Sequence, residues 1–241
     1  MVRYESIRYL LTHAALQDWE IEAMDVKLAY LHGVLEEEID MEKPEGFIAK
    51  GDKDKVCKHI CSLYRLKQAG QVWNRTFTHT IKTKLGFDTM HSDAGVYVLC
   101  HHHKRGDSET DVILILYVDD LLLLGEDLSK IKDIKCQLGK LYQMKDLGPA
   151  SSYFGIRITR DQNTRAIWID QQVYIENALE RFELLDANSM HTPLPTGIHS
   201  EKSEEPVALN TKTYYQQIIG TVIYAAIGTR PDIAFAATRL S

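Results

Sequence analysis

The sequence predicts an α+β fold in which an antiparallel sheet is backed by helices. One observation is an apolar run over residues 111–125 that two adjacent aspartates interrupt, a pattern typical of a buried hairpin whose turn carries the acids. The other is a stripe of large apolar side chains at every fourth position over residues 73–85, which indicates a helix with one buried face. With 44 % hydrophobic residues among 241, the chain has enough apolar material for a sizeable core.

Composition narrows the class of protein further. The net charge of −6 argues weakly against a surface that binds nucleic acid throughout. The chain has no stretch of the roughly 18 to 20 apolar residues that span a bilayer, and it lacks a signal-peptide pattern. Its four scattered cysteines suit a reducing compartment. We therefore expect a soluble, intracellular protein without a membrane partner.

In the first half of the chain, hydrophobic periodicity predicts two helices and a strand. Apolar residues at positions i, i+3, i+4 and i+7 predict a helix over residues 6–17, and alternation then predicts a strand that leads into residues 24–27. An acidic stretch over residues 32–50 ends in a breaker sequence, so we expect a solvated loop there. The basic stretch that follows contains the helix over residues 68–85.

The second half begins with the hairpin, whose strands we place at residues 113–116 and 121–124. The same patterning predicts, in order, a helix over 128–142, strands over 156–159 and 166–169, a helix capped by Asp170, a loop over 189–206 and a C-terminal helical region from Tyr214 that is broken at 230–232.

Asp119 and Asp120 at the centre of the hairpin need a partner, because a buried charge without one is costly. Mg²⁺ is a suitable partner, since it binds through a few carboxylates and takes its remaining ligands from water and substrate phosphates. If Asp25, at the end of a neighbouring strand, meets Asp119, two metal ions could activate an attacking hydroxyl and stabilise a leaving oxygen. The pattern therefore indicates phosphoryl or nucleotidyl transfer.

The segment Tyr117-Val118-Asp119-Asp120 resembles the catalytic hairpin of reverse transcriptases, and the surrounding sequence resembles the Ty1/copia class of LTR retrotransposon polyproteins. The order and spacing of several matching segments make the resemblance specific, whereas one four-residue match is common by chance. The other segments are 24–33 (MDVKLAYLHG), 63–69 (LYRLKQA), 144–148 (MKDLG) and 229–236 (TRPDIAFA).

The resemblance implies a right-hand polymerase palm with a mainly helical thumb and connection. It places the palm, with partial fingers, at residues 1–160 and the thumb-like and connection segment at residues 161–241, leading toward an RNase H domain. We expect the fingers to be largely missing, because the first match falls at residues 2–8, well inside the usual polymerase domain. The implied reaction is RNA-directed DNA synthesis, with two-metal nucleotidyl transfer from a deoxynucleoside triphosphate to a primer 3′-hydroxyl.

The resemblance also implies roles for individual residues. Asp25, Asp119 and Asp120 would be the catalytic acids. Together with the Val26 carbonyl they would bind two Mg²⁺ ions, for which Mn²⁺ could substitute. Lys145 would protonate the departing pyrophosphate.

Contacts to the nucleotide and to nucleic acid follow from the same resemblance. The backbone amides of Leu28 and Ala29 would hold the triphosphate, and Tyr30 would stack under the sugar and exclude a 2′-hydroxyl. Gln68 would contact the nucleotide and the template. Further nucleic-acid contacts would come from Lys67, Arg75, Tyr117 and a primer-grip hairpin at Tyr153, Phe154 and Gly155.

The implied partners are an RNA or DNA template with its primer, deoxynucleotides, and other parts of the Pol polyprotein, namely fingers, RNase H and integrase. The implied location is the cytoplasm, in a virus-like particle, and also the nucleus.

The chain departs from the family pattern at neighbouring positions. Arg65 stands where the family usually has Gly, Gly70 where it has Pro, and Gln71 and Val72 where it has Arg and Ala. The first departure matters most, because Gly can hold a backbone conformation that a side chain disfavours. It favours a second hypothesis, a non-catalytic remnant or co-opted module that binds nucleic acid without turnover.

Two further alternatives are weaker. A metal-dependent nuclease would use the same acids, but the sequence places no water-activating base beside them. A zinc site formed by Cys57, His59, Cys61 and the histidines at 101–103 lacks the paired short-gap spacing of structural zinc sites. The histidine run is better explained as a polar hairpin tip.

Overall fold

The computed structural model describes residues 2–47, 55–102, 108–195, 197 and 208–241. The chain divides into two compact units, Met1–Ala150 and Ser151–Ser241. This division precedes the domain boundary expected after residue 160. That position lies inside strand β10 (Ile156–Asp161), which pairs with a strand on either side of it in the second unit. The polymerase roles expected for the two parts stay predictions.

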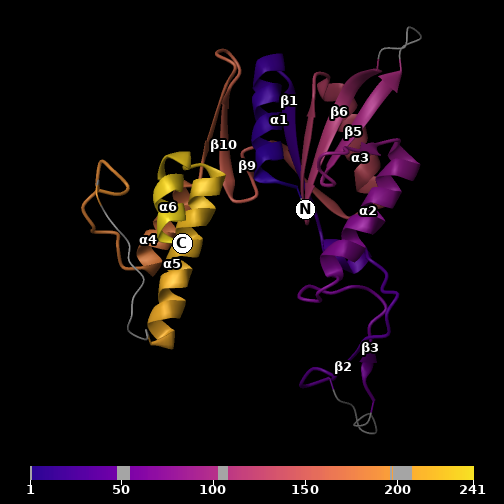
Figure 1. The fold of residues 1–241 in the computed structure, drawn as a ribbon. Coiled ribbons are helices and arrows are strands. Elements are labelled where there is room, and N and C mark those ends of the chain that lie inside the picture. Colours follow the sequence, from indigo (N-terminus) through magenta and orange to yellow (C-terminus); the bar gives the residue numbers. More distant parts are fainter. Residues whose placement is uncertain (1, 48–54, 103–107, 196, 198–207) are drawn as a thin grey trace. The chain divides into compact units, whose positions relative to one another are not determined.

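Within the described residues, the first unit is built on a six-stranded antiparallel sheet in the order β4-β5-β6-β7-β1-β8 (Figure 1). The strands are β1 (Glu20–Val26), β4 (Asp88–Thr89), β5 (Val96–His102), β6 (Ser108–Tyr117), β7 (Asp120–Gly125) and β8 (Met144–Pro149). The antiparallel sheet and its β6–β7 hairpin confirm the sequence prediction, whereas β4 and β8 were not anticipated. β8 is an exposed edge strand that contains Gly and Pro, so it lacks the alternation that marks a strand.

The helices of the first unit are α1 (Tyr4–Gln17), α2 (Ala69–Leu85) and α3 (Leu128–Leu141), close to their predicted ranges. Figure 1 shows α1 on one side of the sheet and α2 and α3 on the other. Asp127 stabilises the start of α3, because its Oδ1 accepts a hydrogen bond from Ser129 N–H at 2.8 Å. Gly86 ends α2 with a φ of 76°, a left-handed conformation that suits Gly.

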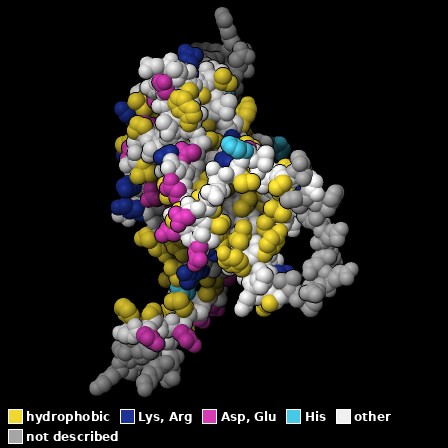
Figure 2. Space-filling view, turned by 90° about the vertical axis from the view of Figure 1, so that its left-hand side faces the viewer, with side chains coloured by type: hydrophobic (Ala, Val, Ile, Leu, Met, Phe, Trp, Pro, Cys, Tyr) yellow, Lys and Arg dark blue, Asp and Glu magenta, His cyan; other side chains and the backbone are white. Residues whose placement is uncertain are grey.

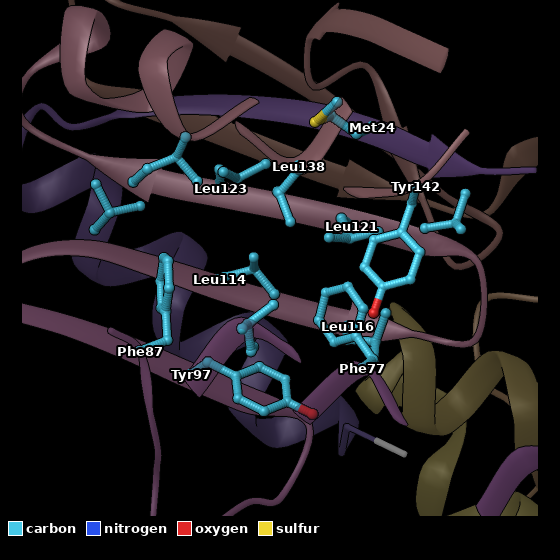
Figure 3. Packing of buried hydrophobic residues seen from close by; sticks show 14 of the residues in the cluster. Met24, Phe77, Phe87, Tyr97, Leu114, Leu116, Leu121, Leu123, Leu138 and Tyr142 are labelled. Atoms are coloured by element: carbon cyan, nitrogen blue, oxygen red, sulfur yellow. The ribbon is translucent and has the colours of Figure 1, made fainter. Parts of the chain in front are cut away.

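β6 and β7 lie inside the sheet and are buried on both faces. Leu114, Leu116, Leu121 and Leu123 belong to the cluster that the sheet forms with α2 and α3 (Figure 3). The alternate side chains on the other face, from Ile113, Ile115, Leu122 and Leu124, are at most 5 % exposed. A strand covered on both faces has no polar side, which explains why the sequence shows continuous apolar runs here.

A buried ion pair ties β1 to α3. Lys135 Nζ lies 2.6 Å from Glu22 Oε2, and the two side chains are only 5 % and 8 % exposed. Lys135 also contacts Asp146 on β8. Burial alone would raise the pKa of Asp146, but hydrogen bonds from Lys135 and from Gly148 N–H outweigh burial and hold that pKa below its usual value. Since removing one partner would leave a buried charge, these contacts fix α3 against the β1–β8 edge of the sheet.

The second unit combines a small antiparallel sheet with helices. Its sheet has the order β11-β10-β9. The elements are β9 (Ser152–Tyr153), β10, β11 (Ala166–Asp170), α4 (Gln172–Arg181), α5 (Leu209–Gly228), η2 (Pro231–Ile233) and α6 (Ala234–Leu240). These elements confirm the predicted strand pair, the helix after Asp170 and the helical C-terminal region with its break.

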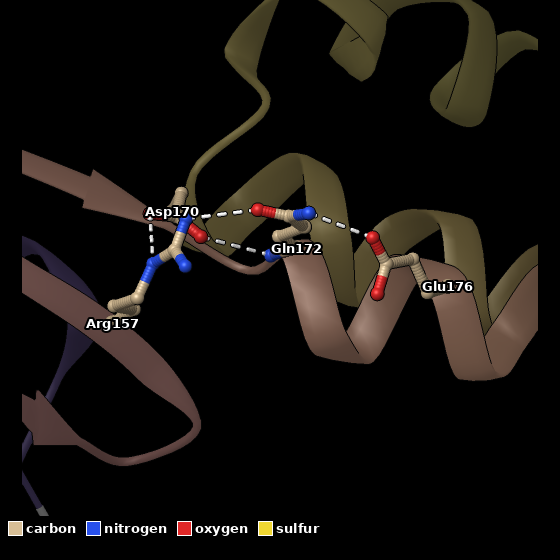
Figure 4. Close-up of polar contacts among 4 residues, drawn as sticks. All are labelled: Arg157, Asp170, Gln172 and Glu176. Atoms are coloured by element: carbon tan, nitrogen blue, oxygen red, sulfur yellow. Dashed lines mark hydrogen bonds and ion pairs between the residues drawn. The ribbon is translucent and has the colours of Figure 1, made fainter.

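A polar network joins the sheet of the second unit to the start of α4 (Figure 4). Arg157 Nε lies 2.8 Å from Asp170 Oδ2, and the Gln172 side chain accepts a hydrogen bond from Arg157 and donates one to Glu176. Asp170 Oδ1 also accepts a hydrogen bond from Gln172 N–H at 3.0 Å. Asp170 therefore stabilises the helix start, although the N-cap residue itself is Gln171.

The acidic segment expected to be a loop contains a short strand. β2 (Asp40–Met41) pairs with β3 (Cys57–Lys58) as a two-stranded sheet, so the loop prediction for residues 32–50 was wrong at this point. Two residues are too few for periodicity to reveal a strand. Parts of the predicted loops over 32–50 and 189–206 lie outside the described residues.

Several large apolar side chains lie on the surface, and Figure 2 shows hydrophobic side chains exposed on one face of the molecule. In the second unit, Leu209, Tyr214 and Phe235 are each at least half exposed. Nevertheless, none of the helices in the described part of the chain is long and apolar enough to cross a membrane.

Candidate active site

The register of the sheet places two of the predicted acids directly opposite each other on adjacent strands. Asp25, near the end of β1, is the direct cross-strand partner of Asp120, the first residue of β7. On its other side Asp25 is paired with Lys145 of β8. Directly opposite residues have Cβ atoms about 4.5–5.5 Å apart. The sheet therefore sets Asp25 between a carboxylate and a cation.

Asp119 lies in the two-residue turn that joins β6 to β7. Tyr117 and Asp120 close the hairpin, and Val118 in the turn has a φ of 55°. The Asp119 carbonyl accepts a hydrogen bond from Val26 N–H at 2.8 Å. This bond joins the turn to the end of β1, so the residues predicted as catalytic acids and Val26 lie together at one end of the sheet.

The electrostatics of this end of the sheet show that the acids affect one another. Burial, followed by the charges of Asp119 and Asp25, raises the pKa of Asp120 to about 6. A carboxyl group with such a pKa holds its proton more tightly than an isolated aspartate does. The cluster is therefore a site of concentrated negative charge that a cation would stabilise.

The segment after β1 holds the residues predicted to bind the nucleotide. Leu28 has a φ of 54° and precedes the short helix η1 (Ala29–His32). Ala29 is fully buried, and Tyr30 is half-buried. Burial, and then the Asp119 charge, raises the pKa of Tyr30, which places this ring near the acids.

Tyr64 was not singled out as a site residue by the sequence, although it belongs to one of the matching segments. Its ring centroid lies 4.5 Å from that of Tyr30. The pKa of Tyr64 is raised by burial first and then by Asp119, Tyr30 and Asp25. Tyr30 and Tyr64 therefore form a pair of rings beside the acids, and only the folded chain reveals it.

A cavity of about 340 Å³ lies beside the hairpin turn. Its lining includes Tyr30, Lys67, Gln71, Trp73, Asn74 and Val118. Gln68 is half-buried at the N-cap of α2, where its carbonyl accepts a hydrogen bond from Val72 N–H. The predicted contacts Lys67 and Gln68 thus lie immediately before α2, whose first turn also lines the cavity.

Arg75 lies further along α2, where Nη2 is 2.6 Å from Glu36 Oε1. Both side chains are more than half exposed, so the ion pair contributes little to stability. The guanidinium can therefore exchange its partner for a phosphate at small cost.

The predicted primer-grip residues form a turn in the other compact unit. Tyr153 is buried in β9, and Phe154 and Gly155 have φ angles of 53° and 71°. The Phe154 ring packs edge-on against Tyr224 of α5 at a centroid distance of 6.4 Å. The turn is therefore packed against a helix of its own unit.

The donor set of the acids suits a hard divalent cation. In the described residues, no group of three or more His, Cys, Asp or Glu side chains is arranged so that it could hold a metal ion by itself. Mg²⁺ binds through one or two carboxylates and completes its shell with water and substrate phosphates. The Asp25–Asp120 pair with Asp119 beside it supplies oxygen ligands of that kind.

The cysteines and histidines considered for zinc are distributed over separate elements. Cys57 is in β3, and the backbone of Cys61 forms an isolated β-bridge with that of Val34. The histidine run begins at the end of β5. His102 is opposite Ser108 of β6, and His103 lies outside the described residues.

The family sequence model described as "Reverse transcriptase (RNA-dependent DNA polymerase)" matches residues 1–196. The chain therefore belongs to the reverse transcriptase family. The proteins similar to this chain include retrovirus-related Pol polyproteins from plant transposons and a putative transposon Ty5-1 protein of yeast.

Three relatives illustrate this similarity. The chain is 42 % identical over 98 % of its length to the Retrovirus-related Pol polyprotein from transposon TNT 1-94 of Nicotiana tabacum. It is 33 % identical over its full length to that from transposon RE1 of Arabidopsis thaliana. It is 32 % identical over 90 % of its length to the putative transposon Ty5-1 protein YCL074W of Saccharomyces cerevisiae, 68 % of which is covered. The chain spans only 18 % and 16 % of the first two polyproteins.

Arg65 has a φ of 75°, in the left-handed region that favours Gly. We expect Arg65→Gly to raise the free energy of unfolding by about 0.5–1 kcal/mol. The backbone penalty of about 1–2 kcal/mol for a residue with a side chain disappears, and the greater freedom of Gly in the unfolded chain offsets part of the gain. Urea denaturation measures the change. Arg65→Ala is the matched control and should give no gain, because Ala keeps the penalty; equal midpoints for the Gly and Ala variants would contradict the backbone explanation.

Asp120→Asn should stabilise the metal-free protein at neutral pH. Because the pKa of Asp120 is about 6 in the folded chain and 3.8 in the reference state, the folded state holds an extra proton between these values, and stability falls as the pH rises through them. Removing the charge should recover about 1–3 kcal/mol at pH 7.5, at 1.36 kcal/mol per pKa unit, and progressively less toward pH 4.5.

Thermal unfolding in the presence of a chelator measures this pH dependence. Asp133→Asn, on the exposed side of α3, controls for the loss of one negative charge. A melting temperature of Asp120→Asn that is unchanged or lower at pH 7.5 would show that burial and the neighbouring acids do not destabilise the Asp120 carboxylate.

Proposed function

We propose that the chain extends a primer 3′-hydroxyl with deoxynucleotides on an RNA or DNA template. The observation that carries the proposal is the register between β1 and β7, which sets Asp25 opposite Asp120 and beside the turn that holds Asp119. Membership of the reverse transcriptase family supports the same reaction.

In this reaction the primer 3′-oxygen forms a bond to the α-phosphorus while the bond from that phosphorus to pyrophosphate breaks. The proton of the 3′-hydroxyl leaves to water. Asp25, Asp119, Asp120 and the Val26 carbonyl would hold two Mg²⁺ ions, or Mn²⁺ in their place. When bound, such ions activate the attacking hydroxyl and stabilise the leaving oxygen. Lys145, which is exposed on β8 next to Asp25, would give a proton to the departing pyrophosphate.

The nucleotide would lie along the segment after β1. We assign the triphosphate to the backbone amides of Leu28 and Ala29, and the sugar to Tyr30, whose ring would exclude a 2′-hydroxyl. Tyr64 supports this assignment, because its ring packs on Tyr30 and limits where that ring can move. Gln68 would contact the base pair that forms between nucleotide and template.

Nucleic acid would be held mainly through its phosphates. Lys67 and Arg75 on α2 would make contacts independent of sequence, and Tyr117 would contact the primer end. Tyr153, Phe154 and Gly155 would form the primer grip. In this proposal the first unit acts as the palm, and the helices of the second unit act as thumb and connection.

Other parts of a Pol polyprotein are the proposed protein partners. Fingers, RNase H and integrase segments would supply the triphosphate grip, template removal and DNA joining that the residues above do not explain. The proposed location is the cytoplasm, in a virus-like particle, and the nucleus.

A second candidate function is binding of primer–template without turnover. The observation that favours it is Arg65, whose positive φ strains the segment that leads into Gln68 and α2. A metal-dependent nuclease is the third candidate, in which water instead of a primer hydroxyl would attack the phosphate.

Primer extension separates the three candidates. The assay uses an RNA template, a labelled DNA primer, deoxynucleotides and Mg²⁺. We expect the wild-type chain to lengthen the primer, and Asp119→Asn to reduce the rate by roughly 10³-fold, because a group that holds the metal ions contributes several kcal/mol to the transition state.

Asp133→Asn on exposed α3 is the matched control and should extend the primer like the wild type. A folded wild-type chain that binds primer–template without extending it would leave the binding module as the function. Shortening of the template or primer that depends on Asp119 would instead establish the nuclease.

A further inference from the structure

The hairpin turn that carries Asp119 receives a hydrogen bond from the side chain of Trp73. The indole Nε1 lies 2.5 Å from the Val118 carbonyl oxygen, although the two residues are 45 positions apart. Trp73 is 1 % exposed, and its ring packs against Phe77 and Tyr142 at centroid distances of 5.3 and 5.4 Å. The indole therefore reaches the turn from a position that the core holds rigidly.

The turn needs such support because its conformation is strained. Val118 has a φ of 55°, whereas Asp119 is not among the residues of positive φ. In a two-residue hairpin turn this combination is typical of type II′, which normally has Gly at its first position. A β-branched residue with positive φ is an outlier, and such strain persists only where the surrounding structure holds it.

The hydrogen bond acts on the peptide unit that decides the type of turn. In the competing type I′ turn both central residues have positive φ, and the two types differ by rotation of the peptide between those residues. The oxygen of that peptide is the Val118 carbonyl. Its rotation would break the bond from Trp73 and redirect the Asp119 side chain. The following peptide is already fixed, since the Asp119 carbonyl accepts a hydrogen bond from Val26 N–H.

We infer that Trp73 is a positioning residue, whose indole N–H holds the Val118–Asp119 turn in the conformation that sets the Asp119 carboxylate beside Asp25. This inference rests on the proposed function, because it gives Trp73 a part in orienting a catalytic acid. Packing of the core alone would not require the N–H group.

Trp73→Phe tests the inference, because Phe keeps an aromatic ring in the core and removes the donor. We expect kcat for primer extension to fall about tenfold or more, since the turn loses the bond that orients Asp119. The KM for the deoxynucleotide should change less than kcat. Val118→Gly favours a type II′ turn without a hydrogen bond from Trp73. In that background, Trp73→Phe should therefore lower kcat by less than about threefold.

Ile81→Val is the matched control, because Ile81 is equally buried in α2 and lies about two helical turns away from Trp73. It should lower the melting temperature while kcat, measured well below that temperature, stays close to wild type. A loss of kcat in Trp73→Phe that equals the loss in Ile81→Val, or that persists in the Val118→Gly background, overturns the inference.

Unfolding supplies a readout that does not depend on activity. Trp73→Phe should lower the melting temperature by about 2–4 °C or more, and by less in the Val118→Gly background. If the wild-type chain extends no primer, the proposed function fails, while this coupling between Trp73 and Val118 still tests the hydrogen bond. Equal shifts in both backgrounds would overturn the role of Trp73.

Discussion

The antiparallel pairing of β1 with β7 is the constraint on which the site depends. Its register puts Asp25 opposite Asp120, and the bond from Val26 N–H to the Asp119 carbonyl continues that pairing into the turn. A slip of one residue would turn every side chain of β1 to the other face of the sheet. Such a slip would move the Asp25 side chain to the face opposite that of Asp120. It would also break the apolar contacts that both faces of the central strands make. The same burial that stabilises the sheet therefore aligns the acids.

Two features of the site lower the stability of the folded protein. Burial, followed by the charges of Asp119 and Asp25, raises the pKa of Asp120, and the turn between β6 and β7 forces Val118 into a conformation that suits Gly. Both features raise the free energy of the folded protein. Both are explained if a divalent cation and a substrate bind at this end of the sheet. Elsewhere in the unit, the buried side chains of Glu22 and Lys135 form an ion pair with each other.

Much of the fold could be predicted, because the helices and the β6–β7 hairpin have clear apolar patterns. Edge strand β8 could not, since its exposed residues follow no alternation. The acids were recognisable as a motif, and the positive φ of Arg65 agrees with the prediction that its position suits Gly. In contrast, the contacts of Tyr64 with Tyr30 and of Trp73 with Val118 join residues that are far apart in the sequence. A local sequence pattern does not predict such contacts, because they form only when separate segments of the folded chain come together.

The central claim is that the acids gathered by β1 and β7 form a divalent-cation site. Calorimetric titration of Mn²⁺ into the chain at pH 7.5, with a deoxynucleoside triphosphate present, tests this claim most directly. The titration is compared for wild type, Asp25→Asn and the surface control Asp133→Asn. The account predicts saturable binding to the nucleotide-loaded wild type and to the control, and loss of the protein-dependent binding in Asp25→Asn. Identical isotherms for wild type and Asp25→Asn would contradict it.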